Sequence, residues 1–292
     1  ARPIAKANRW DTSGAPFALH AGELAKFAGD PTAFADSRNV PQSAEAERRL
    51  AWLGVELQPL DRELAQVHGV LDQIERGSGA LVTHVFAGSP AARAGVQVGD
   101  VILRVQAADA PQPVPVQVQP GQFAFRPFPW DRYDEIPEAY FDQIPAPWGS
   151  AENEVALLLK DFGFGTGYRL DFSRDGKGQT AQLVVEPGPA YYATAAQAED
   201  AAVGLSVREL TFETRRYFQI PEGEPGVIVS RVVAGSRGSV AGVKPYEIVV
   251  TVNDRPVRTV AEFAEGVKAG GALTLAVRRM HQSRVVNITP TP

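Results

Sequence analysis

Short apolar runs separated by glycine, proline and polar turns dominate the chain after about residue 50, a pattern typical of β-strands. The pattern predicts strands over residues 81–86, 101–105, 227–233 and 248–252, and hairpins over 168–185 and 273–288. Asp175-Gly176 between alternating runs indicates the turn of the first hairpin. Apolar residues at helical spacing predict amphipathic helices over 152–161 and 260–268, one directly before each hairpin. The order of elements is therefore the same in both halves.

The sequence itself repeats as well. Residues 79–107 align with residues 226–254 without a gap. The identical pairs are Gly79/Gly226, Val82/Val229, Val85/Val232, Ala87/Ala234, Gly88/Gly235, Ser89/Ser236, Ala94/Ala241, Gly95/Gly242, Val96/Val243 and Val105/Val252. Ordinary composition would give only about two such pairs by chance. The sequence thus predicts two copies of one unit, over 50–187 and 201–290.

The aligned segments predict the same local structure. A strand ends at Ala-Gly-Ser, and one short helical turn follows, closed by Ala-Gly-Val. Gly95 and Gly242 stand where the helix ends, and we expect a positive φ at both. Residues 1–49 precede the first copy and are predicted to hold a helix over 21–27 and a second helix starting at Ser43. Residues 188–200 are expected to be a linker.

The first copy carries an insertion at about 109–150. Residues 111–149 hold nine of the 23 Pro residues, which disfavours regular helix and sheet. They also hold eight aromatic residues, too many for a disordered linker: Phe123, Phe125, Phe128, Trp130, Tyr133, Tyr140, Phe141 and Trp148. We expect an ordered, irregular flap packed against the first copy. It is either a packing extension alone or an element that contacts a partner or gates the site next to it.

Composition narrows the function classes. A chain of 292 residues corresponds to about two domains. The absence of Cys excludes disulfides, thiolate nucleophiles and cysteine-based zinc sites. The net charge is −5 and no basic block occurs, which argues against nucleic-acid binding. No apolar run reaches the roughly 18 residues of a membrane span. The chain starts without Met or a leader, so we expect a processed form or a piece of a longer protein.

The residues Gly88-Ser89-Pro90-Ala91-Ala92-Arg93-Ala94-Gly95-Val96-Gln97-Val98-Gly99-Asp100-Val101-Ile102, with an apolar-Gly-apolar triplet ahead of them, resemble a PDZ domain. The order of elements resembles the bacterial, circularly permuted form found in HtrA/Deg-like trypsin-type serine proteases. The resemblance covers 50–187 and 201–290. The second copy departs from it, because Arg237-Gly238 replaces Pro-Ala and Tyr246-Glu247 replaces Gly-Asp. The implied fold class is α+β and mostly β: two PDZ-like, partly open β-barrel or sandwich units, each with an amphipathic groove helix.

The resemblance implies peptide binding by strand addition. Such domains bind C-terminal or extended polypeptides along a sheet edge, beside the groove helix. The implied carboxylate loops and pairing strands are Leu53-Gly54-Val55 with Glu56, Leu57 and Gln58, and Val203-Gly204-Leu205 with Ser206, Val207 and Arg208. The implied helix residues are Val155, Leu158 and Leu159, and Val260, Phe263 and Val267. Arg48 and Arg49 would attract a carboxylate to the first copy, whereas Glu199 and Asp200 would oppose one at the second.

Catalytic residues are harder to find. The four His residues have no partner at metal-ligand spacing, so neither a metal nor a cofactor is expected. Ser13 lies in Asp-Thr-Ser-Gly-Ala-Pro, faintly similar to the serine segment of trypsin-like proteases, but only twelve residues precede it. A base and an orienting acid have no room there. A β-turn is the preferred interpretation.

The sequence therefore predicts a peptide-binding tandem PDZ module, the substrate-binding or regulatory part of an HtrA-like serine protease. Its partners would be polypeptide C-termini or unfolded segments and an upstream protease domain, with no nucleic acid and no membrane span. By resemblance, its place is the cell envelope, periplasm or exterior. Two alternatives stay open: a stand-alone PDZ scaffold without a protease, and a divergent complete hydrolase that uses Ser13.

Overall fold

The computed structural model describes residues 21–34, 48–74, 77–120, 127–268 and 271–290. The chain divides into two compact units, Ala1–Ala44 and Glu45–Pro292. The described part of the first unit holds helix α1 (Ala21–Gly29), where the sequence predicts one, and the 3-10 turn η1 (Pro31–Phe34). Ser13 and the helix start predicted at Ser43 lie outside the described residues. Among the residues described, no helix is long and apolar enough to cross a membrane.

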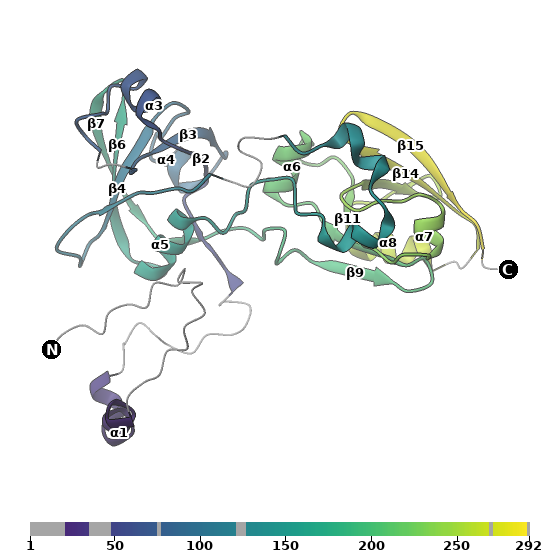
Figure 1. The fold of residues 1–292 in the computed structure, drawn as a ribbon, viewed down its shortest axis with the longest axis horizontal. Coiled ribbons are helices and arrows are strands. Elements are labelled where there is room, and N and C mark those ends of the chain that lie inside the picture. The colour runs from purple at the N-terminus through teal and green to yellow at the C-terminus, as the bar shows by residue number, and fades with distance from the viewer. Residues whose placement is uncertain (1–20, 35–47, 75–76, 121–126, 269–270, 291–292) are drawn as a thin grey trace. The chain divides into compact units, whose positions relative to one another are not determined.

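The first copy is built on an antiparallel sheet (Figure 1). The order of its strands is β2 (Val55–Pro59), β3 (Ala80–Val85), β4 (Val101–Ala107), β6 (Gly167–Arg174) and β7 (Lys177–Val184), with β5 (Val114–Pro115) paired to β4. A separate pair joins β1 (Ala51–Trp52) to β8 (Glu186–Pro187). The helices are α3 (Arg62–Val67), α4 (Pro90–Arg93) and α5 (Glu154–Phe162). Because β2 stands first in this order, it is an edge strand.

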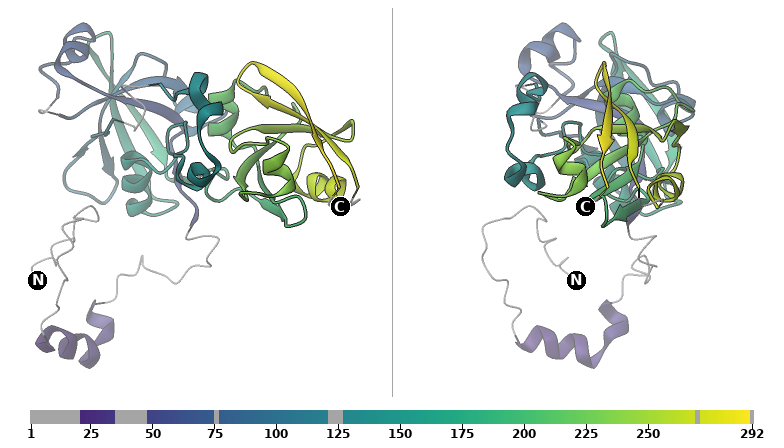
Figure 2. Two further views of the ribbon diagram at one scale, coloured as in Figure 1. Left: turned by 45° about the vertical axis from the view of Figure 1, so that its right-hand side comes forward. Right: turned by 90° about the vertical axis from the view of Figure 1, so that its right-hand side faces the viewer.

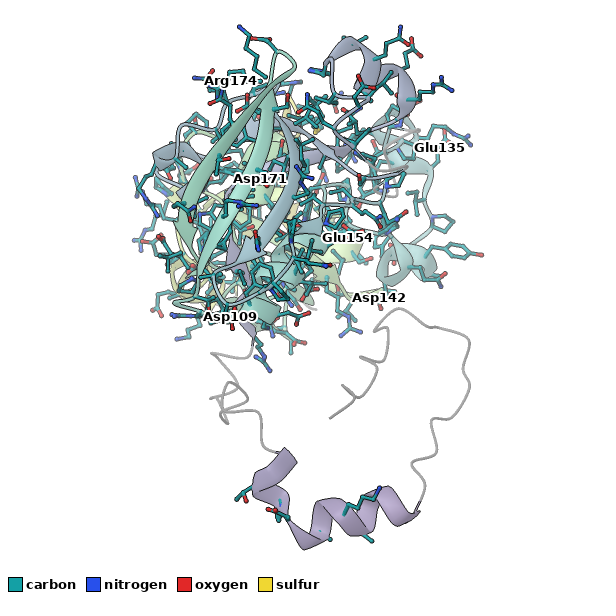
Figure 3. The ribbon with its side chains drawn as sticks, turned by 90° about the vertical axis from the view of Figure 1, so that its left-hand side faces the viewer. Asp109, Glu135, Asp142, Glu154, Asp171 and Arg174 are labelled. Atoms are coloured by element: carbon teal, nitrogen blue, oxygen red, sulfur yellow. The ribbon has the colours of Figure 1, made fainter. Side chains whose placement is uncertain are left out.

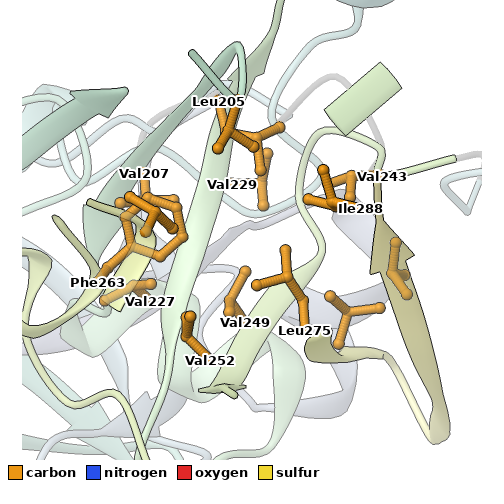
Figure 4. Packing of buried hydrophobic residues seen from close by; sticks show 14 of the residues in the cluster. Leu205, Val207, Val227, Val229, Val243, Val249, Val252, Phe263, Leu275 and Ile288 are labelled. Carbon is orange, nitrogen blue, oxygen red and sulfur yellow. The ribbon is translucent and has the colours of Figure 1, made fainter. Parts of the chain in front are cut away.

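The second copy repeats this plan with one extra strand. Its order is β15 (Gln282–Ile288), β14 (Leu273–Arg279), β12 (Ile248–Val252), β11 (Val227–Val232), β10 (Leu205–Glu209) and β9 (Gln197–Asp200), with β13 (Arg255–Pro256) paired to β12. The helices are α6 (Phe212–Phe218), α7 (Arg237–Val240) and α8 (Val260–Val267). Strand β9 comes from residues that the sequence suggests to be linker. The strands of this sheet and helix α8 enclose a core of valine, leucine and isoleucine side chains that also contains Phe263 (Figure 4).

The predicted fold class is confirmed: the chain is mostly β with short helices, and its sheets are open rather than closed barrels. In both copies a serine caps the short helix after the repeat strand. The Ser89 and Ser236 hydroxyls accept the N–H groups of Ala92 (3.1 Å) and Ser239 (3.2 Å). Gly95 and Gly242, which close these helices, have the expected positive φ of 76° and 86°.

A buried carboxylate is held by an arginine in each copy. Arg174 lies at the turn end of the β6–β7 hairpin (Figure 3). Its side chain donates to both oxygens of Asp100 at 2.7 Å. In the second copy, Arg284 donates to both oxygens of Glu247 at 2.9 and 2.8 Å. Both carboxylates are fully buried. The replacement of Asp by Glu in the second copy therefore preserves the ion pair, with the arginine supplied by β15 instead of β6.

The insertion starts on the first copy, where β5 pairs with β4 and Val116 is buried in the core. Its described aromatic residues pack against the second copy instead, so the expectation that they hold the insertion against the first copy is wrong. Its 3-10 turns η2 (Trp130–Glu135) and η3 (Glu138–Gln143) lie over the second copy (Figure 2). The Tyr133 hydroxyl donates to the Pro245 carbonyl at 2.7 Å, and Phe141 is buried in the core of the second sheet. The Asp134 carboxylate accepts two bonds from Arg279, at 2.9 and 2.7 Å. Phe123 and Phe125 lie outside the described residues.

The insertion meets an aromatic cluster on the second copy. Trp148 is packed among Tyr192, Tyr217, Phe218 and Tyr246, with ring centroids 4.7–6.2 Å apart. Tyr246 stands where the first copy has Gly99 and keeps the left-handed backbone, with φ 62°. Its hydroxyl donates to the Ile144 carbonyl of the insertion at 2.6 Å. The departure from Gly-Asp in the second copy thus creates the surface that binds the insertion.

The two copies also touch directly. Phe212, at the start of α6, packs against Trp52 and Phe86 of the first copy, with centroids 4.7 and 5.1 Å apart. The next residue, Glu213, is 8% exposed, and its Oε1 accepts the Tyr192 N–H at 3.0 Å. Burial raises the pKa of the Glu213 carboxyl to about 7, opposed by that hydrogen bond.

We expect Trp148→Ala to destabilise the protein by about 3–5 kcal/mol, because it empties a site enclosed by four aromatic rings. Tyr140→Ala, in the same insertion but 55% exposed, should change the free energy of unfolding by less than about 0.5 kcal/mol. Urea denaturation of both variants measures this. Equal effects would contradict the packing described for Trp148.

Glu213 should make stability fall as the pH rises from about 4.5 to about 7. In this window the unfolded state releases the Glu213 proton while the folded state retains it, so the free energy of unfolding decreases with pH. The shift corresponds to about 3 kcal/mol. Urea denaturation at several pH values should show this loss in the parent and not in Glu213→Gln. Parallel pH profiles for the two proteins would contradict it.

Candidate functional site

Both copies hold an apolar-Gly-apolar loop tightly against the N-cap serine of the following short helix. Gly54 and Gly204 have positive φ angles of 78° and 74°. A Cβ at either position would lie 2.1 Å from the Cβ of Ser89 or Ser236. Backbone conformation and lack of space both require glycine at these two positions.

The carbonyl groups of the loop are fixed in the same way in both copies. In the first, Ala91 N–H donates to the Leu53 carbonyl (3.0 Å) and Phe86 N–H to the Gly54 carbonyl (2.9 Å). In the second, the equivalent bonds run from Gly238 to Val203 (2.8 Å) and from Val233 to Gly204 (2.9 Å). Each peptide plane is thereby oriented, and the N–H groups of the loop are available to other acceptors.

In the first copy these N–H groups stay available. Among the described residues, neither Leu53 N–H nor Gly54 N–H has an acceptor. Strand β2 follows directly and pairs only with β3 in the part of the chain described, so its outer edge is unpaired. The side chains of Val55, Glu56 and Leu57 are half-buried. Two N–H groups beside an unpaired strand edge can bind a carboxylate and a peptide backbone together.

In the second copy the same positions are filled by the chain itself. Asp200 accepts Val203 N–H at its Oδ1 and Gly204 N–H at its main-chain carbonyl, both at 2.8 Å. Strand β9 pairs along β10, including the predicted pairing residues Ser206 and Val207. Leu205 and Val207 are fully buried.

The predicted helix residues fall into two classes. Val155 and Leu159 of α5, and Phe263 and Val267 of α8, are fully buried core residues. Leu158 is half-buried on the same apolar cluster as Val55 and Leu57. Phe162, one turn further along α5, belongs to this group and is not among the predicted residues, although the apolar spacing of α5 extends to it. Val260 is half-buried on the core cluster of the second copy, as is Ala198 of β9.

Glu56, Arg48, Arg49 and His84, which the sequence also singles out, have the following surroundings. Glu56 forms an exposed ion pair with Arg216 of α6, at 3.4 Å. Arg48 and Arg49 are exposed directly before β1. His84 packs edge-on against Phe86, at a centroid distance of 4.7 Å. Within the described residues, no three His, Asp or Glu side chains form a group that could hold a metal ion.

Comparison with known proteins finds that the chain is similar to DegP-like serine endoproteases. The chain is 30% identical over 224 residues to a probable periplasmic serine endoprotease, DegP-like, of Hahella chejuensis, and 26% identical over 220 residues to one of Marinomonas sp.. These alignments cover 74% and 75% of this chain but only 38% and 37% of the relatives. The chain thus spans less than two fifths of the length of these two relatives.

The chain was also compared with solved structures and with protein-family models. A crystal structure of the HtrA3 PDZ domain bound to a phage-derived ligand aligns with 33% of this chain and 88% of that chain, at 27% identity and a TM-score of 0.27. No protein-family model matches the chain. Over about three quarters of its length, the chain is similar to DegP-like serine endoproteases, as its sequence motifs indicate.

Gly54→Ala should be more destabilising than Gly88→Ala by about 1–3 kcal/mol in the free energy of unfolding. Both glycines have a positive φ, 78° and 70°, so both variants carry the same backbone strain. A Cβ at Gly88 meets nothing within 4 Å, whereas one at Gly54 overlaps Ser89. Urea denaturation separates the two, and equal losses would show that the contact with Ser89 adds nothing.

Proposed function

We propose that the first copy binds polypeptides with a free C-terminal carboxylate by adding them as a strand to the outer edge of β2. The observation that carries this is the pair of N–H groups, at Leu53 and Gly54, that lack an acceptor in the described structure next to an unpaired strand. The terminal carboxylate accepts from these N–H groups, and charge-assisted bonds of this kind are among the stronger hydrogen bonds in proteins.

The apolar side chains at this edge determine what the ligand offers next. Val55 and Leu57 of β2 and Leu158 and Phe162 of α5 are half-buried on one cluster. Alternate side chains of an added strand point toward the same face, so apolar residues at the last position and two before it would cover these four. The backbone of the ligand supplies affinity through ladder bonds, and these side chains supply selectivity.

The similarity to DegP-like serine endoproteases indicates the kind of protein in which this peptide binding would take place. We propose that the chain is the polypeptide-binding, non-catalytic region of a periplasmic protease of this kind, which recognises C-termini or unfolded segments. The module positions them for, or regulates, a protease domain elsewhere in the full protein. The tandem arrangement of two PDZ-like copies is part of this proposal.

A fluorescein-labelled peptide ending in valine with a free carboxylate should bind the protein, and its C-terminal amide should bind at least 10-fold more weakly. The amide lacks the charge that the Leu53 and Gly54 N–H groups would stabilise. Leu158→Glu should also weaken binding at least 10-fold, because it replaces an apolar side chain beside the ligand with a carboxylate, which has the same charge as the ligand's C-terminus. Fluorescence anisotropy measures both.

Val67→Glu is the matched control. It makes the same kind of change at a side chain that is 75% exposed on α3. It should bind the peptide like the parent. Equal affinity for the free acid and the amide would contradict the assignment of the loop, and equal affinity of Leu158→Glu and Val67→Glu would contradict the assignment of the edge.

A further inference from the structure

Strand β9 occupies, in the second copy, the position that is unpaired in the first. It runs antiparallel to β10, with Ala198 opposite Val207 and Asp200 opposite Leu205. Helix α8 lies on its other side, where Val260 and Ala198 are half-buried on the same cluster. An added peptide strand would take this place, and its C-terminal end would lie where Asp200 lies, at the loop.

Asp200 supplies the two acceptors that a terminal carboxylate would supply. Its side chain accepts from Val203 N–H and its main-chain carbonyl from Gly204 N–H, both at 2.8 Å. The equivalent N–H groups in the first copy, of Leu53 and Gly54, have no acceptor in the described residues. The loops are otherwise held alike, so occupancy by Asp200 is the difference between them.

The first copy directs the equivalent segment elsewhere. Leu50 stands four residues before Gly54, as Asp200 stands four before Gly204. Leu50 is buried, and its carbonyl accepts Gly188 N–H at 2.9 Å, next to the β1–β8 pair. The chain ahead of the first loop therefore pairs with β8 and leaves β2 uncovered.

We propose that residues 197–200 are an intramolecular ligand that closes the second copy to polypeptides, with the Asp200 carboxylate in the place of a ligand's terminal carboxylate. This rests on the recognition mode proposed above for the first copy. Ala198 is the only apolar side chain in this short strand, so its hold depends on the ladder bonds, on Asp200 and on its covalent connection. Release of this strand opens a second site for the same class of ligand.

The strand can be weakened selectively. Glu209 N–H donates to the Ala196 carbonyl at 3.0 Å. Antiparallel ladders alternate, so the pair Ala198–Val207 is also hydrogen-bonded. Ala198→Pro removes a ladder bond, and Asp200→Ala removes the side-chain acceptor. Glu199→Ala is the matched control, because Glu199 is an exposed carboxylate on the same strand.

The stoichiometry of binding tests the proposal, with the valine-terminated peptide as the probe in isothermal titration calorimetry. The parent and Glu199→Ala should bind one peptide per chain, and Ala198→Pro/Asp200→Ala should bind two. Two peptides on the parent, or one on the double variant with a cooperative urea transition, would overturn the proposal. If the double variant does not fold, Asp200→Ala alone should show a weaker second site, and its absence would overturn the proposal equally.

The result also separates this proposal from the preceding one. If the parent binds no peptide and the double variant binds one, the function proposed for the first copy fails while the closure of the second stands. If the parent binds one and the double variant binds one, the reverse holds.

Discussion

The contact between a loop glycine and the N-cap serine of the next helix is the constraint on which both copies depend. Gly54 and Gly204 lie so close to Ser89 and Ser236 that no side chain fits. The contact holds the loop where its carbonyls accept N–H groups from the neighbouring helix and strand. The N–H groups of the same peptides must then find acceptors elsewhere. The candidate site is thus a consequence of how the loop is packed.

What happens at that loop depends on the residues just before it. In the second copy residues 197–200 run antiparallel to β10, and Asp200 accepts the N–H groups of the loop. In the first copy Leu50 is buried and its backbone is paired toward β8. The two loops therefore have nearly the same internal hydrogen bonds but differ in whether their N–H groups are available to a ligand. Similarity of motif within a repeat does not by itself predict similarity of binding.

The sequence predicts the strands, hairpins and groove helices well, because their apolar spacing and turn residues are local. It does not predict the short helices α3 and α6, because their N-cap residues Asp61 and Thr211 do not by themselves indicate a helix. Strand β9 is not predicted, because Gln197-Ala-Glu-Asp200 has no β-branched or aromatic residue. Pairing with β10, and not intrinsic β-propensity, makes this segment a strand. The surface against which the insertion packs is not predicted either. Aromatic content indicates that a segment is packed, but it does not indicate which part of the protein the segment contacts.

The insertion links helix α5 of the first copy to the second copy. It leaves the first copy after β5, is anchored on the second by Tyr133, Phe141 and Trp148, and returns into α5. Helix α5 carries Leu158 and Phe162, which face the same cluster as β2. Its position relative to β2 is therefore tied to the second copy by the anchored insertion, while Phe212 and Trp52 join the copies on another surface.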